Sequence, residues 1–177
     1  NYSTEVIKAS NNGIFPFVDR SLVNGTAQDP DRIFSPEVLF ALSDSQRGEL
    51  FEEYFDPSLA PNMVFRMETD LLEQTIYGGT GTGGNLDDYR CRSNWISSGS
   101  ARYFYKYSDM TESGRIENTM IPLIRLGEMY LIAAESQSNS LANGVSYINT
   151  LRKNRGVSNL QTLTTTLLQY EYIREVY

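Results

Sequence analysis

Apolar residues recur at helical spacing in the last third of the chain, and this pattern is the strongest structural signal in the sequence. Pro122 suits the first turn of a helix, where a missing backbone donor costs nothing, and Asn139 or Ser140 suits its end. The apolar stripe of this predicted helix consists of Leu123, Leu126, Tyr130, Ala133 and Ala134. A stripe of this kind predicts one face packed against another element.

Two further helices are predicted to follow. The first ends at Gly156, a residue that readily takes the left-handed conformation of a helix C-terminus, and basic residues precede that end. Its stripe consists of Ala142, Val145, Ile148 and Leu151. The second opens with the capping pair Thr166 and Gln169 and carries the stripe Leu168, Ile173 and Val176. Together these helices predict antiparallel pairs.

The first third of the chain predicts shorter elements. Residues 5–9 indicate a short helix that Gly13 ends, and residues 37–42 indicate a strand. Ser43 and Gln46 form a capping-box pattern, so we expect a helix after them. The apolar side of that helix would consist of Leu50, Phe51, Tyr54 and Phe55.

The middle of the chain predicts a helix over residues 67–76 and a short aromatic strand over residues 102–107. A glycine-rich stretch between them has the spacing of a dinucleotide-binding turn, with Gly79, Gly81 and Gly84. That turn needs a strand before it and a helix after it, whereas turn-forming residues follow it here. We therefore interpret the stretch as a mobile surface loop.

Composition narrows the class of function. A chain of 177 residues with 40% hydrophobic residues fits one globular domain, and its formal net charge is −7. Binding to nucleic acid needs clustered Lys and Arg that displace counterions, and the 15 basic residues here are scattered. We therefore expect no nucleic-acid partner and no basic membrane-binding patch.

Missing residue types exclude several chemistries within this sequence. Histidine is absent and cysteine occurs once, at Cys91. Ser-His-Asp and Cys-His catalysis, a histidine-bearing zinc site and an internal disulfide are therefore excluded for this chain. The sequence also lacks the run of about 18 apolar residues that indicates a transmembrane helix.

Residues 120–135 read MIPLIRLGEMYLIAAE and closely resemble the signature of the SusD/RagB family. In that signature a proline- and leucine-rich stretch leads into Arg-x-x-Glu-x-Tyr-Leu and Ala-Glu. Within it, residues 126–130 also reproduce the L-G-x-x-Y part of the tetratricopeptide pattern. Weaker likenesses to the family occur at residues 88–90, 105–107, 147–156 and 173–175.

The resemblance implies a mainly α fold. We expect tetratricopeptide-like helical hairpins in a SusD-like α-α superhelix, with a long loop-rich subdomain and little β structure. Residues 1–177 would then form a single partial domain, with a loop-rich insertion at about 56–120 and helical hairpins at about 121–177. The family's lipid-bearing N-terminal cysteine and the stretch after its closing helix are not seen in this sequence.

The resemblance also implies a binding function without catalysis. Members of the family hold oligosaccharides, and sometimes peptides, at the outer membrane and cap a TonB-dependent transporter. The expected partners are therefore an oligosaccharide or peptide nutrient and a SusC-like transporter, with no cofactor and no metal. A surface-facing location is expected, with membrane contact only through a lipid anchor that this sequence does not contain.

The candidate ligand-binding residues are chosen by residue type, because no family motif fixes them. A sugar presents an apolar face ringed by hydroxyls, so it needs a flat aromatic plate with polar neighbours. Trp95 is the expected plate, although a lone tryptophan often packs in the core instead. The full set is Trp95, Tyr77, Tyr89, Arg92 and Asn94. Arg125, Glu128 and Glu135 are expected to organise the helices through ion pairs and hydrogen bonds.

Two other functions fit parts of the sequence. A helical-repeat module could bind a peptide or a basic partner protein on a concave face. A glycosidase would need two carboxylates about 5–9.5 Å apart, and the candidates are Glu52, Glu53, Asp56, Asp87 and Asp88. A calcium site at Asp87 and Asp88 lacks the spacing of an EF-hand loop. We expect a binding protein rather than an enzyme.

Overall fold

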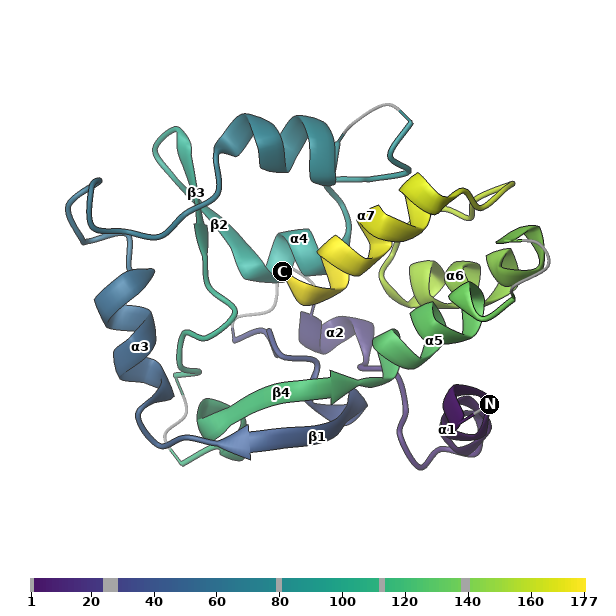
Figure 1. Cartoon of the computed structure of the whole chain (residues 1–177). Coiled ribbons are helices and arrows are strands. Elements are labelled where there is room, and N and C mark those ends of the chain that lie inside the picture. The colour runs from purple at the N-terminus through teal and green to yellow at the C-terminus, as the bar shows by residue number, and fades with distance from the viewer. Residues whose placement is uncertain (1, 24–28, 79–80, 112–113, 138–140) are drawn as a thin grey trace.

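The structure is a computed structural model, and it describes residues 2–23, 29–78, 81–111, 114–137 and 141–177 (Figure 1). Its α-helices are α1 (Tyr2–Asn11), α2 (Arg20–Val23), α3 (Arg47–Tyr54), α4 (Tyr89–Asn94), α5 (Leu126–Glu135), α6 (Leu141–Asn154) and α7 (Thr165–Val176). Shorter helical segments are the 3₁₀-helices η1 (Ser35–Glu37) and η3 (Ile116–Thr119) and the π-helix η2 (Leu71–Ile76). The strands are β1 (Val38–Ser43), β2 (Trp95–Ser98), β3 (Ala101–Phe104) and β4 (Met120–Arg125). The fold is mainly helical, as expected.

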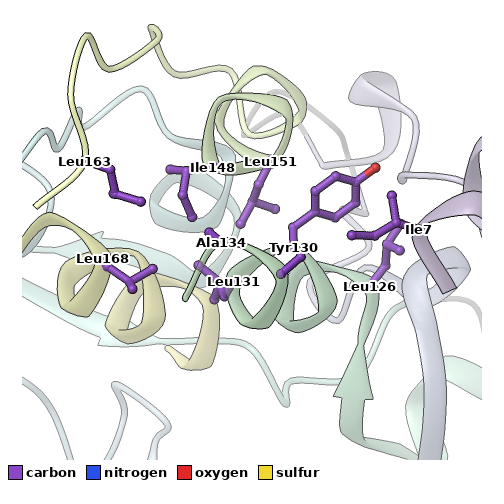
Figure 2. Close-up of a cluster of buried hydrophobic side chains, with 10 residues drawn as sticks. Ile7, Leu126, Tyr130, Leu131, Ala134, Ile148, Leu151, Leu163 and Leu168 are labelled. Carbon is purple, nitrogen blue, oxygen red and sulfur yellow. The ribbon is translucent and has the colours of Figure 1, made fainter. Parts of the chain in front are cut away.

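Helices α5, α6 and α7 form the main core together with α1 (Figure 2). Its buried members are Ile7, Leu126, Tyr130, Leu131, Ala133, Ala134, Ile148, Leu151, Leu163 and Leu168. Helix α6 lies very close to α5, because a Cβ atom at Gly144 would come within 2.5 Å of the Ala134 carbonyl oxygen. The predicted stripes are confirmed in part, because most of their residues are buried in this core, whereas Leu123 is 46% exposed in β4 and Val176 is 57% exposed. An extended tetratricopeptide-like superhelix stays a prediction.

The helix predicted to begin at Pro122 is wrong at its start. Residues Met120–Arg125 form strand β4, which pairs antiparallel with β1, and the helix begins only at Leu126. Proline is tolerated in β4 because the sheet has only two strands, so the missing donor falls on an edge. The expected end of the helix at Asn139 or Ser140 lies outside the described residues.

Two predicted capping residues are wrong, although the helices that were expected after them are present. Thr164, and not Thr166, caps α7, since its hydroxyl accepts a hydrogen bond from the Leu167 amide. Ser43 is the last residue of β1, and Asp44 instead accepts from the Gln46 amide before α3. A capping residue must also have a non-helical backbone conformation, and the spacing of residue types in the sequence does not reveal it.

The segment around Trp95 was expected to be a loop and is instead regular structure. Asp88 caps the short helix α4, and its side chain accepts from the Arg90 amide at 2.9 Å. The chain then enters β2, which pairs with β3 in a hairpin that places Trp95 opposite Phe104. A second core cluster forms here from Leu72, Ile76, Tyr77, Cys91, Trp95 and Phe104.

Among the described residues, none of the helices combines the length and the apolar character that crossing a bilayer requires.

Candidate functional site

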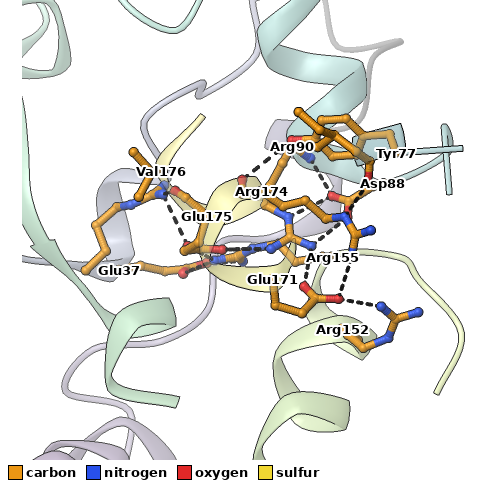
Figure 3. A network of polar contacts seen from close by, with 12 residues as sticks. Glu37, Tyr77, Asp88, Arg90, Arg152, Arg155, Glu171, Arg174, Glu175 and Val176 are labelled. Carbon is orange, nitrogen blue, oxygen red and sulfur yellow. Dashed lines mark hydrogen bonds and ion pairs between the residues drawn. The ribbon is translucent and has the colours of Figure 1, made fainter. Parts of the chain in front are cut away.

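Charged side chains from five distant segments meet in a buried network at the centre of the molecule (Figure 3). Its arginines are Arg90, Arg125, Arg152, Arg155 and Arg174, and its carboxylates are Glu37, Asp88, Glu171 and Glu175. All nine residues have at most 4% of their surface exposed. Most of them lie in the segments that resemble the SusD/RagB signature.

Glu175 pairs with three arginines of the network. Its oxygens lie 2.9 Å from Arg155 Nη2, 3.1 Å from Arg90 Nη1 and 3.2 Å from Arg125 Nη2. Burial alone would raise the pKa of Glu175, but attraction by the three arginines outweighs burial and holds the pKa well below its usual range. Glu175 therefore stays ionised and stabilises the arginines around it.

Glu171 binds the other side of the network. Its carboxylate accepts hydrogen bonds from Arg90, Arg152 and Arg174, and Arg90 is also held by Asp88 at 2.6 Å. Burial opposes ionisation of Glu171, yet the arginines lower the pKa of this carboxyl. With these charges engaged in the interior, the network joins α4, α6 and α7 rather than meeting a ligand.

The expected structural role of the signature residues is confirmed for Arg125, whose guanidinium pairs with Glu175 and donates to the Ile33 carbonyl. Glu135 accepts a hydrogen bond from the Tyr172 hydroxyl at 2.8 Å, which joins α5 to α7. Glu128 is half-buried, and burial raises the pKa of its carboxyl.

Three of the five candidate ligand-binding residues are packed in the interior, namely Tyr77, Asn94 and the expected aromatic plate Trp95. Tyr77 is fully buried, and its hydroxyl donates to the Arg174 carbonyl at 3.5 Å. Asn94 is 2% exposed, and its side-chain oxygen accepts from the Ser93 hydroxyl. Neither Tyr77 nor Asn94 offers a surface to a ligand in this conformation.

Two others do not share a cavity with Trp95. The half-buried ring of Tyr89 packs against the cluster of Val18, Val23 and Phe34. The side chain of Arg92 is 43% exposed and lies 3.5 Å from the Asp87 carboxylate. The structure therefore does not bring the five candidates together in one groove.

Trp95 lines an aromatic pocket that sequence reasoning did not identify. The indole is 3% exposed, and its ring centre lies 4.9 Å from that of Phe104. The pocket has a volume of about 290 Å³ and is lined by Phe55, Phe65, Arg66, Met67, Trp95, Phe104 and Tyr177. Phe65 and Tyr177 are 63% and 46% exposed, so the pocket opens to solvent. Its residues come from distant parts of the chain, and no local spacing could have linked them.

A polar groove of about 500 Å³ adjoins the aromatic pocket. It is lined by Arg66, Met67, Glu68, Thr69, Asp70 and Ser100. Arg66 and Met67 line both cavities, so the aromatic pocket and the polar groove are neighbours, and together we call them the depression.

The carboxylates considered for catalysis or calcium do not all lie together. Glu52 and Asp56 line a separate cavity beside α3, whereas Asp88 is held by Arg90 in the interior. In the part of the chain that the structure describes, no group of three His, Cys, Asp or Glu residues is placed to hold a metal ion. Of the glycine-rich stretch, Gly79 lies outside the described residues, and the Thr82 carbonyl accepts from Arg174.

Comparison with known proteins identifies the family. The family model described as the SusD family matches residues 43–175, which is most of the chain. No curated protein and no solved structure matches the chain. The match covers β4, α5 and α6 and nearly all of the buried network. The chain therefore belongs to the SusD family.

Proposed function

We propose that the chain binds an oligosaccharide or a similar nutrient at the outer membrane, without cleaving it, for delivery to a SusC-like TonB-dependent transporter. Family membership supports nutrient binding in outer-membrane uptake. The aromatic pocket is the observation that carries the proposal for this chain, because exposed rings beside polar groups suit the apolar face and the hydroxyls of a sugar. In this proposal Trp95 forms the inner wall, and Phe65 and Tyr177 form the rim.

Affinity electrophoresis in gels that contain soluble polysaccharides tests the proposal. Phe65→Ala removes a ring that is 63% exposed, so it should abolish retardation and leave the fold intact. Phe40→Ala is the matched control, since this ring is 54% exposed on β1, away from the pocket. Equal retardation of both variants and the unchanged chain would exclude the pocket as the binding site.

A protein-interaction surface is a second candidate, supported by the apolar face of the β1–β4 sheet. Phe40 and Leu42 are 54% and 51% exposed, and they pair with Ile124 and Ile121 across the sheet. Clustered apolar residues of this kind mark contact surfaces. Replacing Phe40 and Leu42 by Ser should then weaken capture by a purified SusC-like transporter while glycan retardation persists. Unchanged capture would remove this candidate.

A further inference from the structure

The segment of residues 65–70 runs along both cavities of the depression. Phe65 lines only the aromatic pocket, Arg66 and Met67 line both cavities, and the three residues that follow line only the polar groove. A ligand that rests on the aromatic rings and continues along this segment therefore enters the polar groove directly.

The polar groove offers acceptors and hydroxyls to its occupant. Glu68 and Asp70 supply carboxylate oxygens, and Thr69 and Ser100 supply hydroxyls. Both carboxylates belong to exposed residues, and Arg66 is the single basic residue of the lining. Such a groove favours a ligand rich in hydroxyl donors and repels a ligand that carries carboxylates.

The arginine of the β2–β3 hairpin does not change the charge balance of the groove. Arg102 on β3 is held by Glu73 at 2.6 Å and also donates to the Trp95 carbonyl. Its charge is already compensated within the protein, so it gives little attraction to an anionic sugar in the groove.

From this arrangement we infer that the depression takes an uncharged oligosaccharide of at least two consecutive sugar units and discriminates against uronic-acid chains. One unit lies against the rings of the aromatic pocket, and the next places its hydroxyls against Glu68 and Asp70. This inference rests on the proposed function and adds to it the ligand's minimum length and its charge.

The test is a titration series with cello-, malto- and xylo-oligosaccharides of one to six units, and with oligogalacturonates of the same lengths. Binding is followed by calorimetry. For the neutral series that binds, affinity should rise about tenfold from the single sugar to the length that fills both cavities, because new hydrogen bonds form, and then level off. Oligogalacturonates of equal length should bind more weakly.

The variant Glu68→Gln/Asp70→Asn tests the contribution of the polar groove separately from that of the aromatic pocket. It should leave the affinity for the single sugar unchanged and lower the affinity for the longer neutral sugars. The difference in affinity between neutral sugars and oligogalacturonates should therefore become smaller. The charge-matched control Glu52→Gln/Glu53→Gln removes two exposed carboxylates from α3 and should change none of these values.

The outcomes distinguish the inference from the function on which it rests. Binding with no gain beyond one unit, or equal binding of neutral and acidic series, overturns the inference and leaves nutrient binding intact. Absence of binding across every series, with the folded state verified by circular dichroism, counts against the proposed function itself.

Discussion

Replacing Glu175 by Gln should severely weaken the fold, because it removes one charge from the centre of the buried network. Glu175 is 2% exposed and lies within 3.2 Å of Arg155, Arg90 and Arg125. Glutamine has nearly the same shape, so packing is conserved. Its amide group, however, carries no charge and turns donors toward guanidinium groups that also donate.

The magnitude follows from the number of partners left behind. Breaking a buried ion pair by removing one partner costs about 3–5 kcal/mol, and here three arginines lose a shared carboxylate. A domain is stable by only about 5–15 kcal/mol in total. For a chain of this length the loss corresponds to a decrease in Tm of about 6–20 °C.

Urea denaturation followed by far-UV circular dichroism measures the effect. Asp87→Asn is the control, because the Asp87 side chain is 74% exposed and lies 3.5 Å from Arg92, so its loss should cost less than about 1 kcal/mol. The pKa of Glu175 is depressed in the folded chain, so its contribution is complete above the unfolded pKa and is lost as the pH falls. The difference in the free energy of unfolding between the unchanged chain and Glu175→Gln should therefore become smaller below about pH 4. A loss under 1 kcal/mol at pH 7 would refute the view that the network holds the fold.

Three further predictions concern single buried groups. Burial lowers the pKa of Lys106 to about 7, so above that pH the unfolded chain binds more protons than the folded chain. The free energy of unfolding should therefore rise from pH 7 to pH 9, and Lys106→Met should flatten this rise in urea denaturation. Gly144→Ala should lower Tm strongly, because the new methyl group meets the backbone of α5. Gly48→Ala should lower Tm less, because its methyl group meets the side chain of Asp109, which is 53% exposed and can move aside at the cost of its ion pair with Arg47. Burial raises the pKa of Cys91 to about 12, so a thiol reagent at pH 8 should label the chain only after denaturant is added, and fast labelling of the native chain would contradict the buried position.

Local patterns predicted the helices well, because each helix carries its own apolar stripe. Ile148 and Leu151 of α6 and Leu168 of α7 lie in the core as expected. Val176, also part of the predicted stripe of α7, is exposed. The helix start predicted at Pro122 is wrong because proline is equally compatible with the first turn of a helix and with a sheet edge, and the partner strand β1 lies far earlier in the chain.

The buried network could be anticipated only in part. Arg125 was expected to be structural, but no local pattern in the sequence pairs Arg125, Arg152 and Arg155 with their carboxylates, which lie in other segments of the chain. Arg155, for example, pairs with Glu37 across 118 positions of sequence. Charged residues ordinarily lie at the surface, so the sequence alone does not predict a charged cluster that is buried this deeply.

The candidate site was anticipated through Trp95 alone. Residue type indicated a sugar-binding plate, and the structure places the indole in the wall of a pocket whose exposed rings belong to other segments. Tyr77 and Asn94 are buried instead, because α4 and β2 form where a loop was expected. Distance along the chain is a poor guide to which aromatic rings share a cavity.

The single tryptophan allows a direct test of the central claim, since indole fluorescence reports on the aromatic pocket alone. Titration with the polysaccharide that retards the chain, under excitation selective for tryptophan, should give a saturable change in emission. Phe65→Ala should abolish the change, and Phe40→Ala should preserve it. Emission that stays constant while the same polysaccharide binds would place the ligand elsewhere on the molecule and contradict the account.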